Sequence, residues 1–461
     1  MNEKLSLNPK VIKQIAGKRL LRKELPLDEQ TYRSLIQMNI LQPIQSIVKK
    51  AFHYECQRCH NTKRSLFGMY PCALCNRMHR YCRKCIAMGR VSDCERLYEW
   101  HGPEPIWSIH EQPCTWDGEL TLEQKKAAER IVTAIQFKEK EILSYAVCGS
   151  GKTEMLFPGM SYALQQGMRL CIATPRTDVV RELTPRLRQA FQSVSIQALY
   201  GGSQDKSGTA QLIISTTHQL FRYSDAFDVV MVDEVDAFPY HKDMSLPIAT
   251  KRALKPSGTM VYLTATPRDE QKKKIERQQL PHIFVARRYH NHPLPVPKLK
   301  FAFSLQKNLV NNQFPKSFLR WYSTRKHDTR QVLVFVPTIQ LAKSLEQTFN
   351  TIYPEIKSSA VHSEDSNREE KVYLYRQKKI DILFTTTILE RGVTFPAIDV
   401  AILHAGHHVF DEAALVQIAG RAGRSPDDPD GEVVFFHDGK TEAMVQAIYA
   451  IEAMNKRGGF T

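Results

Sequence analysis

Short apolar runs alternate with longer amphipathic stretches over most of the chain. In its central part the runs include EILSYAV, RLCIATPR, IQALYGG, QLIISTTHQL and FDVVMVDEVDAF, separated by helix-forming segments such as TDVVRELTPRLRQAF. Continuous apolar strands that alternate with helices are typical of a parallel sheet covered on both faces. A second unit of the same kind follows with RQVLVFVPT, SSAVHSE, DILFTTTILERGVTF and IDVAILHAG. We therefore predict an α/β protein with two parallel-sheet lobes.

Breaks in this pattern predict where one domain ends and the next begins. Clusters of proline and glycine between periodic segments usually mark connections, and a basic, leucine-containing start and a cysteine-rich block precede the first lobe. The predicted parts are a helical extension (1–50), a zinc-binding domain (51–95), a linker (96–119), the first lobe (120–285), an interlobe linker (286–316) and the second lobe (317–461).

Length and charge narrow the function further. With 461 residues, the chain is long enough for two or three domains that each bury a core. Its formal net charge of +16 favours an anionic partner such as nucleic acid or an acidic membrane surface. No apolar run reaches the roughly eighteen residues that a membrane-spanning helix needs, and the stretch MNEKLSLNPKVIKQ lacks the apolar segment of a signal peptide. We therefore expect a cytosolic protein.

The stretch AVCGSGKTE, Ala146 to Glu154, follows an apolar strand and precedes a helix. A glycine-rich turn in this position directs backbone N–H groups of the turn and the helix toward phosphate oxygens. We expect Lys152 to neutralise charge on the β- and γ-phosphates of ATP and Thr153 to offer its hydroxyl to Mg²⁺. The predicted nucleotide-binding residues of this loop are Gly149, Ser150, Gly151, Lys152 and Thr153.

A helix with the sequence LTLEQKKAAERIV precedes this loop. Thr121 suits the N-cap position, and Gln124, three residues later, would complete a capping box. The same glutamine is also suitably placed before the loop to bind adenine. The sequence leaves both roles open.

Carboxylates and hydroxyls follow two further apolar strands. In VVMVDEVD, Asp233 is expected to hold Mg²⁺, mostly through water, and Glu234 to polarise the attacking water. In TMVYLTATP, Thr264 and Thr266 could transmit the state of the nucleotide to the second lobe. Ligands of parallel sheets bind at the carboxyl ends of the strands, where all these residues are predicted to lie.

Two other strand ends carry ATPR and STTHQ. Small hydroxyls, backbone N–H groups and an arginine in loops suit contact with a phosphate backbone without reading of bases. The predicted DNA-binding residues are Thr174, Pro175, Arg176, Thr216, Thr217 and His218, together with Thr386 and Thr387 of the second lobe.

The second lobe has no phosphate loop but contains QIAGRAGR, Gln417 to Arg424, on a helix predicted to begin with DEAALV. Arg421 and Arg424 are three residues apart and would share one helix face, from which they could stabilise charge in the transition state. The small residues Gly420, Ala422 and Gly423 would let another backbone approach closely. The predicted catalytic set is Lys152, Asp233, Glu234, Arg421 and Arg424.

Seven of the ten cysteines lie between Cys56 and Cys94, mostly in CxxC pairs. Two such pairs make a tetrahedral four-thiolate site for structural Zn²⁺. We predict Cys56, Cys59, Cys82 and Cys85 as ligands, because each of these pairs follows an extended stretch with a tyrosine. Cys72 and Cys75 could instead replace one pair, or form a second site with Cys94 and a histidine. A redox-active CxxC pair is disfavoured because no βαβ unit surrounds it.

The motifs GSGKT, ATPR, TTHQ, DEVD, TAT, FVPT, TTTILERG and QIAGRAGR occur in the order and spacing of a superfamily 2 helicase core. That resemblance implies two RecA-like lobes over about residues 120–430. Together with the cysteine block, CIATPRTDVV, VDEVDAFPY and TTTILERGVT, the chain resembles the ComFA family of late-competence DNA-uptake ATPases.

The ComFA resemblance implies a motor that uses ATP and Mg²⁺, carries Zn²⁺ and is stimulated by single-stranded DNA. Such a translocase helps to import transforming DNA into the cytoplasm, at the inner face of the cell membrane, with ComFC and the ComEC channel as partners. A homo-oligomer is compatible with this resemblance.

Two other functions fit the same motifs. One is a DNA helicase of replication restart or repair similar to PriA, although those proteins carry their cysteines within the second lobe and this chain carries them before the first. The other is a nucleic-acid-binding adaptor whose nucleotide site only switches conformation. The chain departs from RNA helicases in DEVD and in Gln417, where they have histidine, and no wedge for strand separation is evident.

Overall fold

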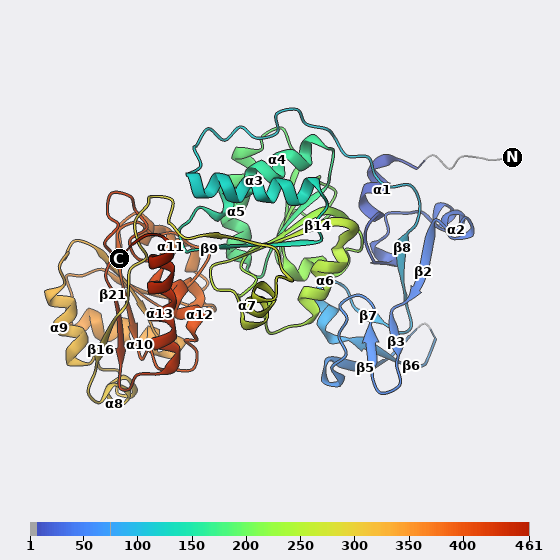
Figure 1. Ribbon diagram of the computed structural model, residues 1–461. Helices are drawn as coiled ribbons and strands as arrows, with labels where there is room; N and C mark the ends of the chain where they lie inside the picture. The colour runs from blue at the N-terminus through green and yellow to red at the C-terminus, as the bar shows by residue number, and fades with distance from the viewer. Residues whose placement is uncertain (1–6, 74, 461) are drawn as a thin grey trace.

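The computed structural model describes residues 7–73 and 75–460. Three bodies lie in a row: an N-terminal domain, a first α/β lobe in the middle and a second α/β lobe (Figure 1). Along the row, the N-terminal domain lies at one end, and α9 (Lys316–Thr324) of lobe 2 lies at the other. No helix in the described ranges is long and apolar enough to cross a membrane.

Lobe 1 is built on a parallel sheet in the order β11-β12-β10-β13-β14-β9-β15. Neighbouring strand residues point to opposite faces, so Val229 packs in the core on the side of α3, α4 and α5, and Val230 packs in the core beneath α6. Both faces of the sheet are therefore buried, which is why its strands are apolar throughout. The elements are α3 (Leu122–Gln136), β9 (Glu141–Ala146), α4 (Lys152–Gln165), β10 (Leu170–Thr174), α5 (Thr177–Ala190), β11 (Ile196–Leu199), β12 (Leu212–Thr216), η4 (Thr217–Arg222), β13 (Phe227–Val232), α6 (Ser245–Ala253), β14 (Leu254–Thr264), α7 (Asp269–Glu276) and β15 (His282–Val285).

Lobe 2 repeats this design with a parallel sheet in the order β16-β21-β20-β17-β19-β18. The predicted α/β class with two parallel-sheet lobes is confirmed. The interlobe connection is shorter than the expected 286–316, because β16 (Lys298–Phe301) already pairs with β21 (Val433–His437). The other elements are α8 (Leu305–Val310), α9 (Lys316–Thr324), β17 (Gln331–Phe335), α10 (Ile339–Ile352), β18 (Ser358–Val361), α11 (Arg368–Arg376), β19 (Ile382–Thr385), η5 (Thr387–Leu389), β20 (Ile398–Leu403), α12 (Glu412–Ala419) and α13 (Glu442–Arg457).

The N-terminal domain differs from the expected order of helical extension, zinc-binding domain and linker. Strand β8 (Arg96–Trp100), in the expected linker, pairs with β1 (Leu20–Leu21) and β2 (Leu41–Gln45) of the expected helical extension. Such pairing between distant segments leaves no local signal in the sequence. The remaining elements are α1 (Pro9–Ile15), η1 (Arg22–Glu24), α2 (Glu29–Gln37), β3 (Ile47–Lys49), β4 (Tyr54–Cys56), η2 (Arg64–Leu66), β5 (Phe67–Pro71), β6 (Met78–Cys82), η3 (Arg83–Met88) and β7 (Val91–Ser92).

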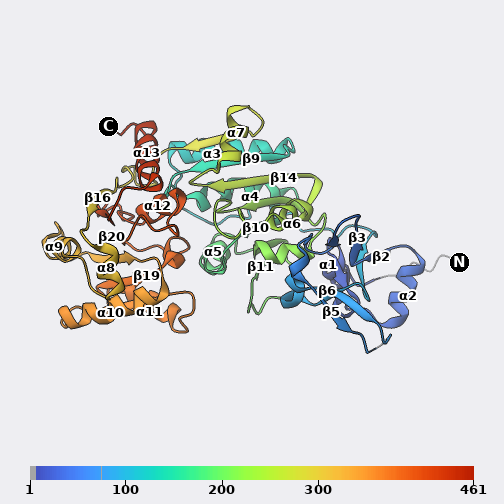
Figure 2. The same ribbon diagram turned by 90° about the horizontal axis from the view of Figure 1, so that it is seen from below.

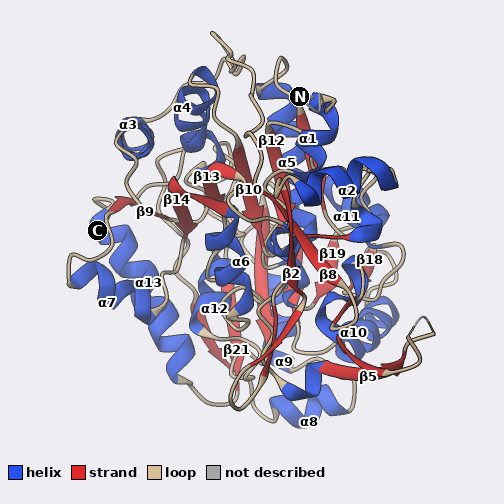
Figure 3. Cartoon of the chain, turned by 90° about the vertical axis from the view of Figure 1, so that its right-hand side faces the viewer, coloured by secondary structure: helices blue, strands red, loops and turns tan. Residues whose placement is uncertain are grey.

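The N-terminal domain packs on lobe 1, on the side away from lobe 2 (Figure 2). Arg222 of η4 donates to the carbonyl of Met88 at 2.8 Å, and Lys84 donates to the Ser245 hydroxyl at 2.5 Å. The apolar cores of the domain and of lobe 1 are continuous. Viewed along the row from this end, β2, β8 and β5 lie in front of the two lobes (Figure 3). The domain and lobe 1 therefore form one packed unit.

Candidate active site and metal centre

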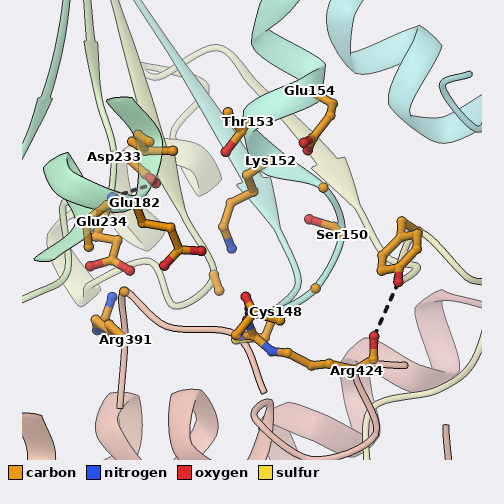
Figure 4. Close-up of a pocket in the computed structure, with 18 of the residues that line it drawn as sticks. Cys148, Ser150, Lys152, Thr153, Glu154, Glu182, Asp233, Glu234, Arg391 and Arg424 are labelled. Carbon is orange, nitrogen blue, oxygen red and sulfur yellow. Dashed lines mark hydrogen bonds between the residues drawn. The ribbon is translucent and has the colours of Figure 1, made fainter. Parts of the chain in front are cut away.

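A cleft of about 490 Å³ lies between the two lobes (Figure 4). Lobe 1 supplies the glycine-rich turn after β9 and the acidic residues after β13, and lobe 2 supplies residues 391–394 and the end of α12. In Figure 4, Lys152 and Thr153 lie on one side of the cleft, and Arg391 and Arg424 lie on the other. The predicted nucleotide-binding and catalytic residues therefore meet in one place, which is lined by Gln124, Gly149, Ser150, Gly151, Lys152, Thr153, Asp233, Glu234, Arg421 and Arg424.

The glycine-rich turn has the backbone that a phosphate-binding loop requires. Gly151 is the N-cap of α4 with φ of +71°, and a Cβ at this position would lie 2.4 Å from Nε2 of Gln124. Only glycine fits there. The Lys152 ammonium donates to the carbonyl of Ala146 at 3.0 Å, which holds it over the turn. The positive end of α4 and this ammonium make the cleft suitable for phosphate groups.

Gln124 braces the turn. Its Oε1 accepts a hydrogen bond from the Thr121 backbone N–H at 2.7 Å, and its Nε2 donates to the carbonyl of Ser150 at 2.8 Å. The capping role left open by the sequence is confirmed. These two hydrogen bonds engage both ends of the amide within the chain. Binding of adenine by Gln124 stays a prediction.

The acidic pair after β13 lies at the bottom of the cleft. Burial, reinforced by the neighbouring Glu234 carboxylate, raises the pKa of Asp233 to about 7. Glu234 has a left-handed backbone with φ of +56°, and its buried Oε2 has no hydrogen-bond partner among the described residues. Two crowded carboxylates with an unpartnered oxygen fit a divalent cation, which would remove their mutual repulsion. The residues therefore fit Mg²⁺.

Asp236 connects the two lobes. Its carboxylate accepts hydrogen bonds from the hydroxyls of Thr264 at 2.5 Å and Thr266 at 2.6 Å, and it forms an ion pair with Arg391 of lobe 2. Burial alone would raise the pKa of Asp236, but the Arg391 guanidinium outweighs it and lowers the pKa to about 2. The two threonines therefore contact lobe 2 through one shared carboxylate.

The two lobe 2 arginines do not share a helix face, so that prediction is wrong. Helix α12 ends at Ala419, and Gly423 takes a φ of +60°, so Arg421 and Arg424 lie in the turn after the helix. The side chain of Arg421 is buried, and its Nε donates to the carbonyl of Glu390 at 2.8 Å. The Arg424 guanidinium is partly exposed and lines the cleft.

Lobe 2 approaches the phosphate loop as closely as its small residues predicted. A Cβ on Gly420 would lie 2.5 Å from Cβ of Cys148. The Cys148 thiol also donates to Oε1 of Gln417 at 3.2 Å. A larger residue at position 420 would push the two lobes apart.

The residues predicted to bind DNA lie at the carboxyl edges of the two sheets. Thr174 and Thr216 are paired at the ends of β10 and β12, and Thr386 follows β19. Thr174, Pro175, Thr216 and Thr217 are buried, whereas His218 and Thr387 are partly exposed. The Arg176 guanidinium donates to the carbonyl of Ile388 in lobe 2. DNA binding by these residues stays a prediction.

Four cysteines of the N-terminal domain form a buried cluster. The Sγ atoms of Cys56, Cys59, Cys82 and Cys85 all lie within 4.8 Å of one another. The distance is 3.8 Å between the sulfurs of Cys56 and Cys85 and 3.5 Å between those of Cys59 and Cys82, which is too long for disulfides. Hydrogen bonds with the neighbouring thiols, together with burial, raise the pKa of Cys59 far above its usual value. A bound Zn²⁺ would stabilise the deprotonated thiols, which are otherwise disfavoured in this buried cluster. The residues therefore fit the metal.

These are the four cysteines chosen from the sequence. Cys72 and Cys75 do not replace either pair, because they lie in a separate group with Cys94.

Comparison with known proteins agrees with this arrangement. Residues 4–99 match the N-terminal domain of the competence protein ComFA, residues 117–269 match the res subunit of type III restriction enzymes, and residues 313–426 match the helicase conserved C-terminal domain. The competence protein ComFA of Bacillus subtilis (strain 168) is 44% identical over 443 residues, which are 96% of this chain and 94% of that protein. The chain belongs to the ComFA family. The resemblance inferred from the motifs is confirmed.

A second ComFA relative and a solved structure extend the comparison. ComFA of Streptococcus pneumoniae (strain ATCC BAA-255 / R6) is 36% identical over 404 residues, covering 88% of this chain and 91% of that protein. The structure of S. cerevisiae Dbp5 bound to RNA and ADP BeF3 has a TM-score of 0.52 at 16% identity, over 73% of this chain and 88% of that one. The latter likeness shows the helicase-like fold of this ComFA family member.

Sequence reasoning missed three residues of the interlobe contact. Asp236 lies in DEVD and Arg391 lies in TTTILERG, two motifs described above. Their ion pair joins segments far apart in the chain. Arg288, in the interlobe connection, is buried and donates to the carbonyl of Ala422 at 2.8 Å. Of these three residues, only Asp236 had a sequence feature that could have indicated a role in the site, namely its position after a buried strand.

Proposed function

We propose that this protein is an ATP-driven translocase on single-stranded DNA that helps to import transforming DNA into the cytoplasm during natural competence. Membership of the ComFA family and the helicase-like lobes support a competence-related, helicase-like ATPase. The observation that carries the proposal is the interlobe cleft. There a phosphate-binding turn of one lobe faces arginines of the other.

Each group in the cleft has a role in ATP hydrolysis in this proposal. Lys152 and the backbone N–H groups of the turn would bind the phosphates. Thr153 and Asp233 would hold Mg²⁺, which would neutralise developing charge. Glu234 orients and deprotonates water. Arg424, whose guanidinium is only partly exposed and lines the cleft opposite the turn, stabilises the transition state. Arg421 holds residues 390–393 of lobe 2 in place through its hydrogen bonds to their carbonyls.

Hydrolysis would drive movement because both lobes contribute to one site. Contacts that depend on the γ-phosphate favour the closed arrangement, and their loss favours opening. The paired strand ends at Thr174 and Thr216 belong to lobe 1, and Thr386 belongs to lobe 2, so each would move with its own lobe. Alternate closing and opening would therefore shift the grip along a DNA strand, without reading of bases.

A zinc ion bound by Cys56, Cys59, Cys82 and Cys85 has a structural role in this proposal. Four thiolates leave no open position for water or substrate. The cluster belongs to the core that joins the N-terminal domain to lobe 1. Zinc would therefore keep that domain fixed to the lobe that binds the phosphates.

The partners and the place of action also belong to the proposal. Its family membership supports ComFC and the ComEC channel as partners, at the cytoplasmic face of the membrane, with a homo-oligomer as a further option. The net charge of +16 supports contact with DNA or with acidic lipid headgroups.

ATP hydrolysis, measured without nucleic acid and then with single-stranded DNA, duplex DNA or RNA, tests the proposal. We expect strong stimulation by single-stranded DNA and none in Lys152→Ala. A preference for RNA would instead indicate an RNA helicase. Unwinding of a forked duplex would favour replication restart or repair. If Glu234→Gln binds ATP and still supports transformation in cells, the protein is an adaptor switched by nucleotide binding.

A further inference from the structure

A second group of metal-binding side chains lies at the end of the β5–β6 hairpin. Cys72 and Cys75 follow β5, His79 lies in β6, and Cys94 follows β7. The sulfur of Cys94 lies 3.5 Å from that of Cys72 and 3.9 Å from that of Cys75. The Cys75 sulfur also lies 3.0 Å from Nε2 of His79. The three sulfurs therefore lie within 4.8 Å of one another, and the imidazole nitrogen lies beside one of them.

The sulfur–sulfur distances fit a tetrahedral metal site and no disulfide. With Zn–S bonds of about 2.3 Å and Zn–N bonds of about 2.0 Å, ligand atoms of a tetrahedron lie roughly 3.5–3.8 Å apart. A disulfide requires sulfurs about 2.05 Å apart, far closer than the 3.5 and 3.9 Å observed here. Soft thiolates with one imidazole in tetrahedral geometry select zinc over magnesium or calcium.

The histidine is oriented for a metal by an independent contact. Nδ1 of His79 lies 2.8 Å from a carboxylate oxygen of Asp93, and the same oxygen accepts the backbone N–H of Arg80 at 3.0 Å. A carboxylate in this position takes the proton-bearing Nδ1 and leaves the lone pair of Nε2 free. Metal-binding histidines are usually held in this way. In this structure Nε2 lies beside the Cys75 sulfur.

We propose that Cys72, Cys75, His79 and Cys94 bind a second zinc ion, separate from the four-cysteine site. It would clamp the turn of the β5–β6 hairpin to the chain between β7 and β8. In the strands of the hairpin, Met69 is 51% exposed and Met78 is 58% exposed, so burial of these two side chains contributes little to holding the hairpin. A metal would therefore supply order at this end of the hairpin.

The two sites should differ in how fast they lose zinc. All four cysteines of the first site have relative exposures of 0%, whereas Cys75 is exposed and Cys94 is partly exposed. A chelator can reach the second site without unfolding of the domain. The second site should therefore release its zinc first.

Zinc content of the purified full chain tests the proposal. We expect two zinc ions per chain in the unmodified protein, and one in the double variant Cys72→Ser/Cys94→Ser. The control Cys114→Ser changes a cysteine outside both groups and should keep two. One zinc per chain in the unmodified protein, or a content unchanged by the double variant, would overturn the second site.

The rate of zinc release tests the second site even if the double variant fails to fold. When the native chain is mixed with a chromophoric chelator, we expect one zinc to leave in a fast phase and one in a slow phase. In Asp93→Asn, which keeps all four ligands, the fast phase should accelerate by about 10- to 100-fold while the slow phase stays unchanged. Release of one zinc per chain in a single phase would overturn the proposal. A fast phase with the same rate in Asp93→Asn would also overturn it.

Discussion

The ion pair between Asp236 and Arg391 should control closure of the two lobes. The pair is buried on both sides, with side-chain exposures of 0% for Asp236 and 2% for Arg391. We expect Arg391→Ala to leave a buried carboxylate without its counter-charge whenever the lobes close on ATP. Because both groups regain water when the lobes separate, the cost should fall on closure and not on the stability of either lobe.

The structure sets the size of this effect. Removal of one partner from a buried ion pair costs about 3–5 kcal/mol. Asp236 keeps the hydroxyl hydrogen bonds of Thr264 and Thr266, which offset part of that cost. We therefore expect about 2–4 kcal/mol, which lowers kcat/KM for ATP by roughly 30- to 900-fold.

A double-mutant cycle on kcat/KM for ATP, at saturating single-stranded DNA, measures the coupling. Because Asp236→Ala removes the same pair, the double variant should be less impaired than additivity predicts, by at least about 1.5 kcal/mol. The matched control is Glu369→Ala, which breaks an exposed interlobe pair with Arg181 and should change kcat/KM by at most about fivefold. Additive effects of the two single variants on kcat/KM would show that Asp236 and Arg391 are not coupled in closure of the lobes.

Three further outcomes follow from the site. Glu234→Gln should lower hydrolysis by about 10²–10⁴-fold yet retain binding of a fluorescent ATP analogue, and loss of binding would contradict its assigned role. Arg424→Ala should lower kcat by about 10³-fold or more with little change in KM, whereas an unchanged kcat would exclude it from the transition state. Cys59→Ser should lower the thermal midpoint of lobe 1 as well as that of the N-terminal domain, because the two share a core. A calorimetric transition of lobe 1 that does not move would show that the domains are uncoupled.

Much of the fold and most of the site could be predicted from local patterns. Apolar runs such as the one before Asp233 predicted the buried parallel strands. The CxxC spacing indicated a metal site, and the tyrosine-containing stretch before two of the pairs selected Cys56, Cys59, Cys82 and Cys85. These signals are short-range, because strand burial and metal-ligand geometry both constrain neighbouring residues.

The parts that could not be predicted depend on contacts between distant segments. Strand β8 forms only because β1 and β2 lie on either side of it. The end of α12 at Ala419 was missed because QIAGRAGR contains no proline, and its glycines were attributed to packing alone. The link from Thr264 through Asp236 to Arg391 requires the two lobes to be in contact.

Measuring movement along single-stranded DNA distinguishes a translocase from an ATPase that only binds DNA. Oligonucleotides of increasing length, each with a fluorophore at one end, would be mixed rapidly with the protein and ATP. We expect a lag before the fluorescence change that grows linearly with oligonucleotide length in the native protein and is absent in Lys152→Ala. ATP hydrolysis stimulated by DNA, but with a lag independent of length at both labelled ends, would contradict translocation.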